Sequence, residues 1–337
     1  YDLASVTKIA ATTLSVMHLY DQGKMDIDYK LSWYLPYLTG SNKENMIIRE
    51  VMAHQAGLKP WIPFYLYTKD DKKRHKDLYS RNLDENHTVK VAHKMYIDQE
   101  YKYTLYDSII YSNLRKRFDY KYSDLGFYML SQTIENLSNK PLDIYADDAF
   151  YKPLGIKHLC FKPIGKFKLN EIVPTEKDDY FRNQLVHGYV HDPGAAMLGG
   201  VAGHAGLFGN ANDLAVLMQM FLQNGYYGGY QYIQKKTVKE FTKQQFPLND
   251  NRRGIGFDRP LEEDKEQGPT CESVSDNSYG HSGFTGTYTW NDPKYNLVYV
   301  FLSNRIYPTA NNTKLIKMNT RTKIQQVIYD AILDKDK

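Results

Sequence analysis

The sequence has little of several features that mark whole classes of protein. Only two of its 337 residues are cysteines, and neither Cys160 nor Cys271 stands in a C-x-x-C or other zinc-binding spacing. It contains no run of about 18 apolar residues, the length that a membrane-spanning helix needs. Its formal net charge is only +4, and the basic cluster at 69–76 is interrupted by acids. This balance excludes the concentrated basic surface of a nucleic-acid-binding protein, so no nucleic-acid partner is expected.

Motifs for binding phosphate or metal ions are also missing. The glycine-rich stretch 198–209 fits neither G-x-x-x-x-G-K-[ST] nor G-x-G-x-x-G. Gly203 and Gly206 are therefore predicted to allow tight turns beside a packed helix. His187 and His191 have the H-x-x-x-H spacing of some zinc sites, but the neighbouring glycines and proline favour a loop, and the sequence shows no third ligand. We expect neither a metal nor a cofactor.

What the sequence does contain fits a mixed α/β (α+β) fold. A chain of this length with 42% hydrophobic residues can bury a large core. Apolar residues at helical spacing predict helices, and two β-rich runs around the turn at 292–295 predict an antiparallel hairpin. The expected helices lie at 5–21, 47–52, 122–136, 141–155, 212–224 and 322–333, and the expected strands at 285–292 and 296–304. Together they predict a central antiparallel sheet flanked by helices, with a second, mostly helical lobe.

The segment at 66–120 has a different composition from the rest of the chain. It is dense in lysine, aspartate and tyrosine and poor in glycine, and 89–95 reads as a short helical run. We interpret it as a variable helical insertion or a lid. The expected organisation is one domain over 1–337, with the helical lobe at roughly 25–210 and the sheet and terminal helix at roughly 211–337.

The first residues carry the most informative pair. Ser5 and Lys8 are three positions apart at the start of an apolar helical run, so both side chains can face the same cleft. Ser5 would lie in the first helical turn, where free amides and the helix dipole favour negative charge. A serine there can act as a nucleophile with the lysine as its base. A helix cap followed by a solvated lysine is the simpler reading of such a pair, and further motifs must support the functional one.

Two further clusters support the functional interpretation of Ser5 and Lys8. Tyr122 stands at the start of a predicted helix, where it could relay protons, and Asp124 could hold a substrate amide or Lys8. The second cluster, His281-Ser282-Gly283, directly precedes the predicted hairpin. Small residues at that point allow a substrate to lie along the strand as an additional edge.

These motifs, S-V-T-K at 5–8, Y-S-D at 122–124 and H-S-G at 281–283, resemble the motif set of serine β-lactamases and penicillin-binding proteins. The similarity is strongest to the branch of class C β-lactamases, DD-peptidases and esterases, and it covers nearly the whole chain. The resemblance implies that Ser5 attacks a carbonyl to form an acyl-enzyme, with Lys8 and Tyr122 deprotonating it. Burial and nearby cations would lower the pKa of the lysine into the range of a base.

The resemblance assigns roles to other residues as well. The backbone amides of Ser5 and Phe284 would form the oxyanion hole, with Ser282 and Gly283 beside the substrate. His281 stands where many relatives carry lysine, and would bind a substrate carboxylate or assist proton transfer. We expect Arg305 to be a surface residue or, alternatively, a ligand for a substrate carboxylate. His54 and His204 are expected as hydrogen-bonded core residues, with His204 near the cleft.

Two details depart from a simple match. Tyr111-Ser112-Asn113 fits the tyrosine-x-asparagine pattern better by its letters, but we prefer Tyr122, since an apolar helix follows it. Asp124 occupies the usual asparagine position. An ionised Asp124 near Lys8 would keep the lysine protonated, and Tyr122 would then carry more of the base role.

The predicted function is that of a serine hydrolase acting through an acyl-enzyme on a D-amino-acid peptide, a β-lactam or a small ester. The alternative is a non-catalytic module that keeps the fold and binds peptidoglycan or a partner. The expected partner is a small-molecule or peptide substrate from the cell wall, and the family's usual substrates imply a periplasmic or cell-surface location. Since almost no chain precedes the candidate nucleophile Ser5, we expect the natural protein to extend upstream, with fusion to another module as one arrangement.

Overall fold

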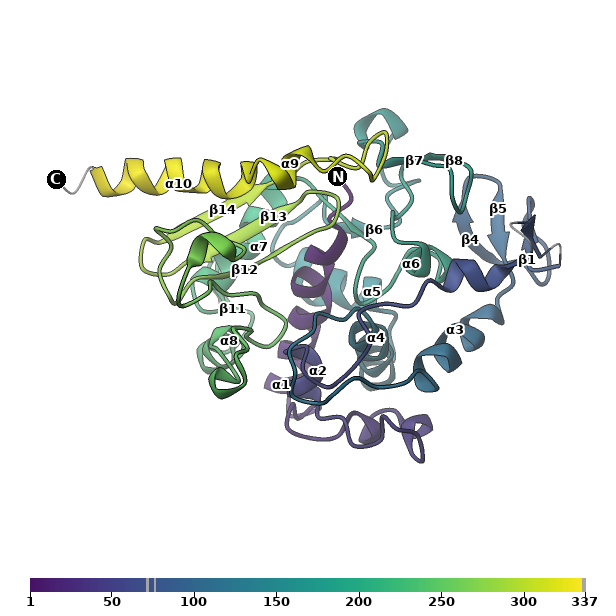
Figure 1. The fold of residues 1–337 in the computed structure, drawn as a ribbon, viewed down its shortest axis with the longest axis horizontal. Coiled ribbons are helices and arrows are strands. Elements are labelled where there is room, and N and C mark those ends of the chain that lie inside the picture. Colours follow the sequence, from purple (N-terminus) through teal and green to yellow (C-terminus); the bar gives the residue numbers. More distant parts are fainter. Residues whose placement is uncertain (71–72, 76, 335–337) are drawn as a thin grey trace.

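The computed structural model describes residues 1–70, 73–75 and 77–334, and a helical segment beginning at Ala4 lies at its centre (Figure 1). This segment opens as a 3₁₀ turn (Ala4–Val6), continues as a π-helix (Lys8–Thr13) and ends as α1 (Leu14–Asp21). Every residue from 6 to 17 is buried, as in a helix covered on all sides. Gly23 follows with a φ of +68° and closes the helix, so the predicted helix and its C-cap are confirmed.

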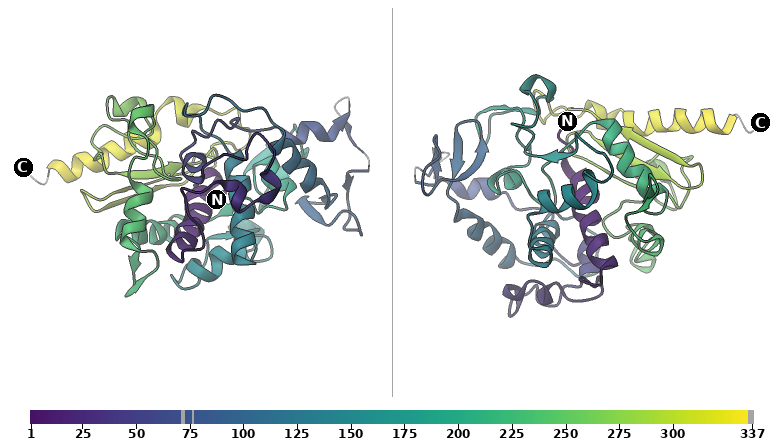
Figure 2. Two further views of the ribbon diagram at one scale, coloured as in Figure 1. Left: turned by 90° about the horizontal axis from the view of Figure 1, so that it is seen from below. Right: turned by 180° about the vertical axis from the view of Figure 1, so that it is seen from behind.

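The further helices lie on both sides of this segment, and Figure 2 shows the main sheet on one side together with some of them. They are α2 (Ile48–Met52), α3 (Tyr101–Ile110), α4 (Leu125–Ser138), α5 (Leu142–Ala146), α6 (Pro193–Met197), α7 (Ala211–Leu222), α8 (Lys235–Thr242), α9 (Lys314–Lys317) and α10 (Thr320–Leu333). Short 3₁₀ or π turns lie at Leu31–Trp33, Pro36–Leu38, Phe64–Thr68, Asp147–Tyr151, Leu169–Glu171, Pro247–Asn249 and Lys265–Gln267. The helices predicted within 47–52, 122–136, 141–155, 212–224 and 322–333 are therefore confirmed.

The main sheet is antiparallel and contains β12 (Tyr279–Ser282), β13 (Tyr288–Asp292) and β14 (Leu297–Phe301) in that order. The predicted hairpin is its β13–β14 half. Alternation along β13 sends successive side chains to opposite faces. Asn291 donates to the Met218 carbonyl of α7 at 2.7 Å on one face, while Tyr288 bonds Gln325 of α10 at 3.2 Å on the other. Two helices thus cover the two faces of the sheet.

The other strands are short. They are β1 (Lys69–Asp70), β2 (Lys73–Arg74), β3 (Tyr79–Ser80), β4 (Val89–Ala92), β5 (Met95–Ile97), β6 (Cys160–Phe161), β7 (Glu176–Asp178), β8 (Gln184–Val186), β9 (Leu207–Phe208), β10 (Tyr226–Tyr227) and β11 (Tyr230–Gln231). Cys160 and Cys271 are buried free thiols. None of the described helices has the length and apolar character that crossing a membrane requires.

The prediction of a helical run at 89–95, within the segment 66–120, was wrong. Residues 89–95 are not helical but form the hairpin of β4 and β5, which pair in a small sheet of order β3-β5-β4. The physical reason is alternation: Met95 and Ile97 are buried while Tyr96 between them is only half-buried, and Lys94 supplies the turn with a φ of +47°. The helix of this segment, α3, lies further along the chain.

The chain before Ser5 is held between two strands. The Leu3 amide donates to the Leu207 carbonyl of β9 at 2.9 Å. The hydroxyl of Thr287, just before β13, donates to the Leu3 carbonyl at 2.9 Å. These bonds place Ser5 where the sheet meets the helices.

Candidate active site

Ser5 lies in a turn that a buried carboxylate holds in place. Ala4, directly before it, has a φ of +47°, a left-handed conformation that is rare for residues other than glycine. Asp2 accepts hydrogen bonds from the Ala4 amide at 2.8 Å and from the His191 amide at 2.7 Å. Such strained backbone persists only where its surroundings over-determine it. The two bonds therefore fix the direction in which Ser5 points.

Ser5 opens onto a cavity of about 870 Å³ between the sheet and the helices. This is the size of a pocket for a small ligand or a short peptide. Predicted site residues that line it are Ser5, Tyr122, Asp124, His204, His281, Ser282, Gly283, Phe284 and Arg305. Lys8 lies beside Ser5 with its side chain buried. The structure thus brings all the predicted site residues together.

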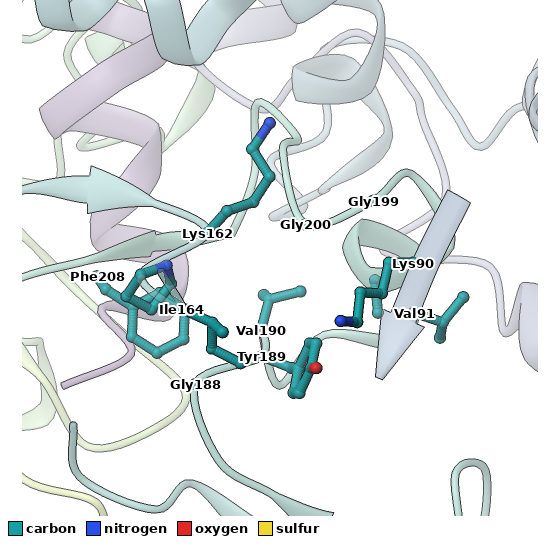
Figure 3. A pocket seen from close by; sticks show the side chains of 12 residues that line it. Lys90, Val91, Lys162, Ile164, Gly188, Tyr189, Val190, Gly199, Gly200 and Phe208 are labelled. Carbon is teal, nitrogen blue, oxygen red and sulfur yellow. The ribbon is translucent and has the colours of Figure 1, made fainter. Parts of the chain in front are cut away.

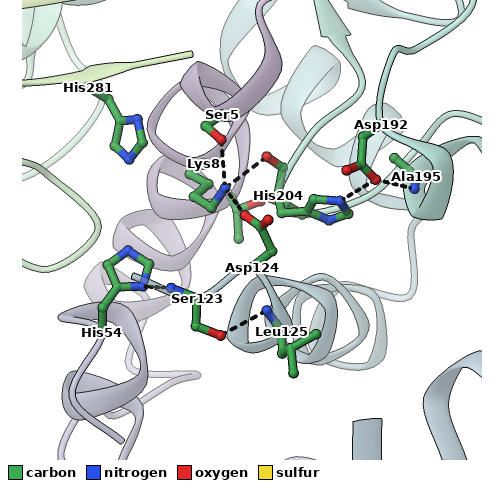
Figure 4. Close-up of polar contacts among 12 residues, drawn as sticks. Ser5, Lys8, His54, Ser123, Asp124, Leu125, Asp192, Ala195, His204 and His281 are labelled. Carbon is green, nitrogen blue, oxygen red and sulfur yellow. Dashed lines mark hydrogen bonds and ion pairs between the residues drawn. The ribbon is translucent and has the colours of Figure 1, made fainter. Parts of the chain in front are cut away.

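Lys8 is a buried ammonium with three oxygen acceptors (Figure 4). Its Nζ donates to Asp124 Oδ1 at 2.6 Å, to Ser5 Oγ at 3.1 Å and to the His204 carbonyl at 3.1 Å. Burial lowers the pKa of Lys8, but the Asp124 carboxylate and, after it, Tyr122 together more than offset this, and the net pKa is raised. The prediction that burial and nearby cations make Lys8 an easily deprotonated base was wrong. Asp124 instead holds the lysine protonated, as its departure from asparagine led us to expect.

Tyr122 stands beside this ion pair. The Lys8 Nζ lies 4.9 Å from the centroid of its ring. Its hydroxyl oxygen is buried and has no hydrogen-bond partner among the described residues. The pKa of Tyr122 is raised: burial is the largest cause, and Asp124 adds to it, while Lys8 lowers the pKa. Tyr111, its rival by sequence, is 78% exposed just beyond α3, outside the cavity lining. The geometry therefore favours Tyr122.

His281 lies on β12 with an uncharged ring. Its Nδ1 is 2.7 Å from the Ser282 carbonyl, which can only accept, so the proton is assigned to Nδ1. Burial lowers its pKa to about 3, with Arg253 and Lys8 as the next causes. At neutral pH His281 therefore does not supply the positive charge of a lysine. Its Nε2 is buried without a partner in the described chain, which leaves it available as a hydrogen-bond acceptor.

Gly283 and Phe284 continue from β12 past Ser5. A Cβ on Gly283 would come within 2.1 Å of Thr287 Oγ1 and 2.6 Å of the Leu3 carbonyl oxygen. Glycine alone lets the end of this strand lie against the chain that carries Ser5. The Phe284 ring is half exposed to the cavity. It stacks on His191 at 5.3 Å, and the Arg305 guanidinium lies 4.6 Å from it on cation–π contact.

Arg305 is a cavity residue rather than a surface one. It is 8% exposed and donates to the Asn312 carbonyl at 2.9 Å. Within the described chain neither Arg305 nor Arg321, which also lines the cavity, has a carboxylate within ion-pair distance. This leaves two guanidinium groups on one wall that an anionic group could approach.

The histidines predicted as core residues have the expected contacts. His204 Nε2 lies 2.8 Å from Asp192 Oδ1, and its ring stacks on Tyr128 at 4.0 Å (Figure 4). His54 Nδ1 accepts from the Ser123 amide at 3.2 Å. His191 pairs with Glu176 at 3.0 Å. Within 1–70, 73–75 and 77–334, no cluster of histidine, cysteine and acidic side chains could hold a metal ion.

Sequence reasoning missed one group in the cavity wall, formed by Arg252, Arg253 and Asp258. Both guanidinium groups share the Asp258 carboxylate, at 2.7 Å from Arg252 and 3.3 Å from Arg253. These residues lie in a loop after α8, and Asp258 forms an isolated bridge with Gly280 of β12. Two adjacent arginines before a glycine form no recognisable sequence motif. Only the pairing of this loop with β12 shows that these residues line the cavity.

A second cavity of about 160 Å³ lies elsewhere and shares no lining residue with the first (Figure 3). Its wall is mostly aliphatic, aromatic and glycine residues, and Lys90 and Lys162 are its charged groups. It offers no serine beside a base, and the larger cavity remains the candidate active site.

A partly buried serine–lysine contact, a tyrosine beside it and an antiparallel strand along one wall define a serine hydrolase of the β-lactamase and penicillin-binding-protein fold. Comparison with known proteins supports this assignment. The profile of the β-lactamase family matches residues 1–317. The chain belongs to this family.

The chain is similar to several individual members of this family and of its fold. The chain is 34% identical over 325 residues to "N-acetylmuramyl-L-alanine amidase" of Bacillus subtilis, covering 90% of this chain and 68% of that protein. It is 32% identical over 355 residues to "Putative D-alanyl-D-alanine carboxypeptidase" of Escherichia coli K12, covering 99% and 76%. A penicillin-binding-protein homologue from Caulobacter crescentus has the same fold, with a TM-score of 0.60, 16% identity and coverage of 90% and 77%.

Replacing each tyrosine by phenylalanine separates the two candidates. We expect Tyr122→Phe to slow the labelling of Ser5 by a fluorophosphonate roughly 100-fold or more, because the variant loses the phenol oxygen that, once ionised, would accept the serine proton. Tyr111→Phe, the matched control, should retain the wild-type rate. A larger loss in Tyr111→Phe than in Tyr122→Phe would contradict the assignment.

Asp124→Asn tests the control of Lys8. Without the carboxylate, burial dominates and the pKa of Lys8 falls. Asp124 also raises the pKa of Tyr122, so without its charge the phenolate forms more readily, and we expect the rising limb of the pH–rate profile for Ser5 labelling to move to lower pH. The control is Asp28→Asn, which breaks an ion pair of an exposed carboxylate with Arg49 and should leave the limb in place. An unchanged limb in Asp124→Asn would show that Asp124 does not govern the base.

Proposed function

We propose that this chain hydrolyses an amide bond of a cell-wall-derived muramyl peptide through an acyl-enzyme on Ser5. The observation that carries the proposal is the 3.1 Å contact between Lys8 Nζ and Ser5 Oγ on a cavity of about 870 Å³. A nucleophile beside a proton-handling group in a concave site is the arrangement that acyl transfer requires. The relative named as a muramyl-L-alanine amidase supports this choice of amide.

The first step is the attack of Ser5 Oγ on the amide carbonyl. Protonated Lys8 donates to this oxygen and stabilises its developing negative charge, while Tyr122, reacting in its phenolate form, accepts the proton. The carbonyl oxygen becomes an oxyanion, which the amides of Ser5 and Phe284 would stabilise. When the C–N bond breaks, Tyr122 returns the proton to the leaving amine. A water molecule then attacks the Ser5 ester and gives a proton to the Tyr122 phenolate, which passes it to Ser5 Oγ as the C–O bond breaks and the acid is released.

The wall of the cavity suits a substrate with a sugar. Trp61, Tyr65 and Tyr180 line it, and Trp61 is 57% exposed. Aromatic rings offer flat apolar faces with polar edges, against which a sugar ring can pack. The strand beside Ser5 carries the uncharged His281, so a carboxylate next to the broken bond would find no cation there.

A D-alanyl-D-alanine carboxypeptidase is the second candidate. It is favoured by Arg305 and Arg321, which line the cavity and could bind the terminal carboxylate of such a substrate. The relative from Escherichia coli carries that name. In either case the substrate comes from the cell wall, and we propose that the chain acts outside the cytoplasm.

A non-catalytic binding module is the alternative to any hydrolase. A module that only binds has no need of a serine, a buried lysine and a tyrosine in contact. Their joint presence in the cavity supports catalysis.

Intact-protein mass after incubation with a fluorophosphonate tests the nucleophile. We expect one covalent adduct in the wild type and none in Ser5→Ala, because the hydroxyl at position 5 is the reacting group. Ser15→Ala is the matched control, since the Ser15 hydroxyl is buried against the Ala11 carbonyl and should not affect labelling. An adduct that persists in Ser5→Ala would place the nucleophile elsewhere, and absence of any adduct would support the binding module.

Release of the amine product identifies the substrate. We expect turnover of N-acetylmuramyl-L-alanine and little turnover of a peptide ending in D-Ala-D-Ala. Faster release of D-alanine from that peptide would favour the carboxypeptidase instead. Rapid hydrolysis of a chromogenic cephalosporin, with neither amide cleaved, would point to a β-lactamase.

A further inference from the structure

The charges around Tyr122 do not cancel evenly. On one side Lys8 and Asp124 form a close pair at 2.6 Å, so their opposite charges largely offset each other. On another side two histidines face the tyrosine. His54 lies 4.5 Å from its ring centroid and His281 5.9 Å. Burial lowers the pKa of both imidazoles, with Arg253 as the next cause, so neither contributes a charge at neutral pH.

Among the described residues, Arg253 is the other cation that lies at this ring besides Lys8. Its guanidinium carbon lies 5.2 Å from the Tyr122 centroid, and the residue is 4% exposed. Asp258 lies 3.3 Å from it but also pairs with Arg252 at 2.7 Å, so two cations share one carboxylate and a positive charge is left over. A cation close to a buried phenol favours its ionised form.

Hydrogen bonding orients Arg253 and leaves part of it free. Its Nε donates to the Tyr120 hydroxyl at 3.1 Å, and the Asn251 side chain accepts from its backbone amide at 3.0 Å. Its Nη1 is buried and has no partner in the described chain. The Tyr122 hydroxyl and His281 Nε2 are buried without partners in the same way. Buried groups left unpaired are costly, and their gathering at one point indicates that the site needs them.

We propose that Arg253 is a positioning residue that stabilises the deprotonated form of Tyr122 with its buried charge, in place of the charge that His281 does not carry. The inference rests on the proposed function, in which Tyr122 accepts the Ser5 proton. Lys8, tied to Asp124, then serves mainly as a hydrogen-bond donor to Ser5.

The pH dependence of Ser5 labelling by a fluorophosphonate, measured on the full chain, tests this. We expect Arg253→Gln to react about tenfold more slowly at neutral pH and its rising limb to lie about one pH unit higher, because Tyr122 ionises less readily. Arg253→Lys keeps the charge and should return the limb toward its wild-type position. Arg259→Gln, which removes a nearby arginine bonded to the Thr242 and Asp276 carbonyls, should leave the limb unchanged.

Asp258→Asn separates the charge from a folding defect. It removes the shared carboxylate, so the positive charge at Tyr122 grows and the limb should move to lower pH, opposite to Arg253→Gln. Thermal unfolding of each variant shows whether it is folded. A slower Arg253→Gln whose limb stays at the wild-type pH would overturn the inference and leave Arg253 a structural residue. Failure of the wild type to label at all would instead overturn the proposed function, and the inference with it.

Discussion

The site depends on a buried ammonium group. Taking the charge of Lys8 out of water costs several kcal/mol, about the loss expected for one ion of a buried pair. The structure offsets this with three oxygens, from Asp124, Ser5 and the His204 backbone. They come from the start of α4, the first helical turn and the glycine-rich loop. One side chain therefore ties together three segments that are far apart in the sequence.

The glycine-rich loop can reach Lys8 only because it packs closely. A Cβ on Gly203 would come within 2.1 Å of the Phe127 carbonyl oxygen, and Gly206 has a φ of +119°. Thr12 donates to the Gly203 carbonyl at 2.7 Å and anchors the loop to the central helix. The prediction of tight turns beside a packed helix is thus confirmed. The same close approach directs the neighbouring His204 carbonyl toward the ammonium.

Charge is distributed unevenly among the residues that line the cavity. Asp124 neutralises Lys8, whereas the shared Asp258 only partly neutralises its two arginines. The uncharged His281 lies between these groups on β12. An asparagine at 124 or a lysine at 281 would change this balance of charge.

The sequence by itself determined the central helix with Ser5 and Lys8, the terminal hairpin and helix, and the family. These signals are local, because periodic apolar residues and short motifs can be recognised without knowledge of tertiary contacts. The hairpin at 89–97 was read as a helix, since a short apolar run is ambiguous between the two periods. Only the tertiary structure decided which acids neutralise which cations. The pKa of Lys8 depends on Asp124, and that of His281 on burial and on Arg253. Arg253 in turn lies against Tyr122. These partners are distant in the sequence, and no spacing of residues encodes their contacts.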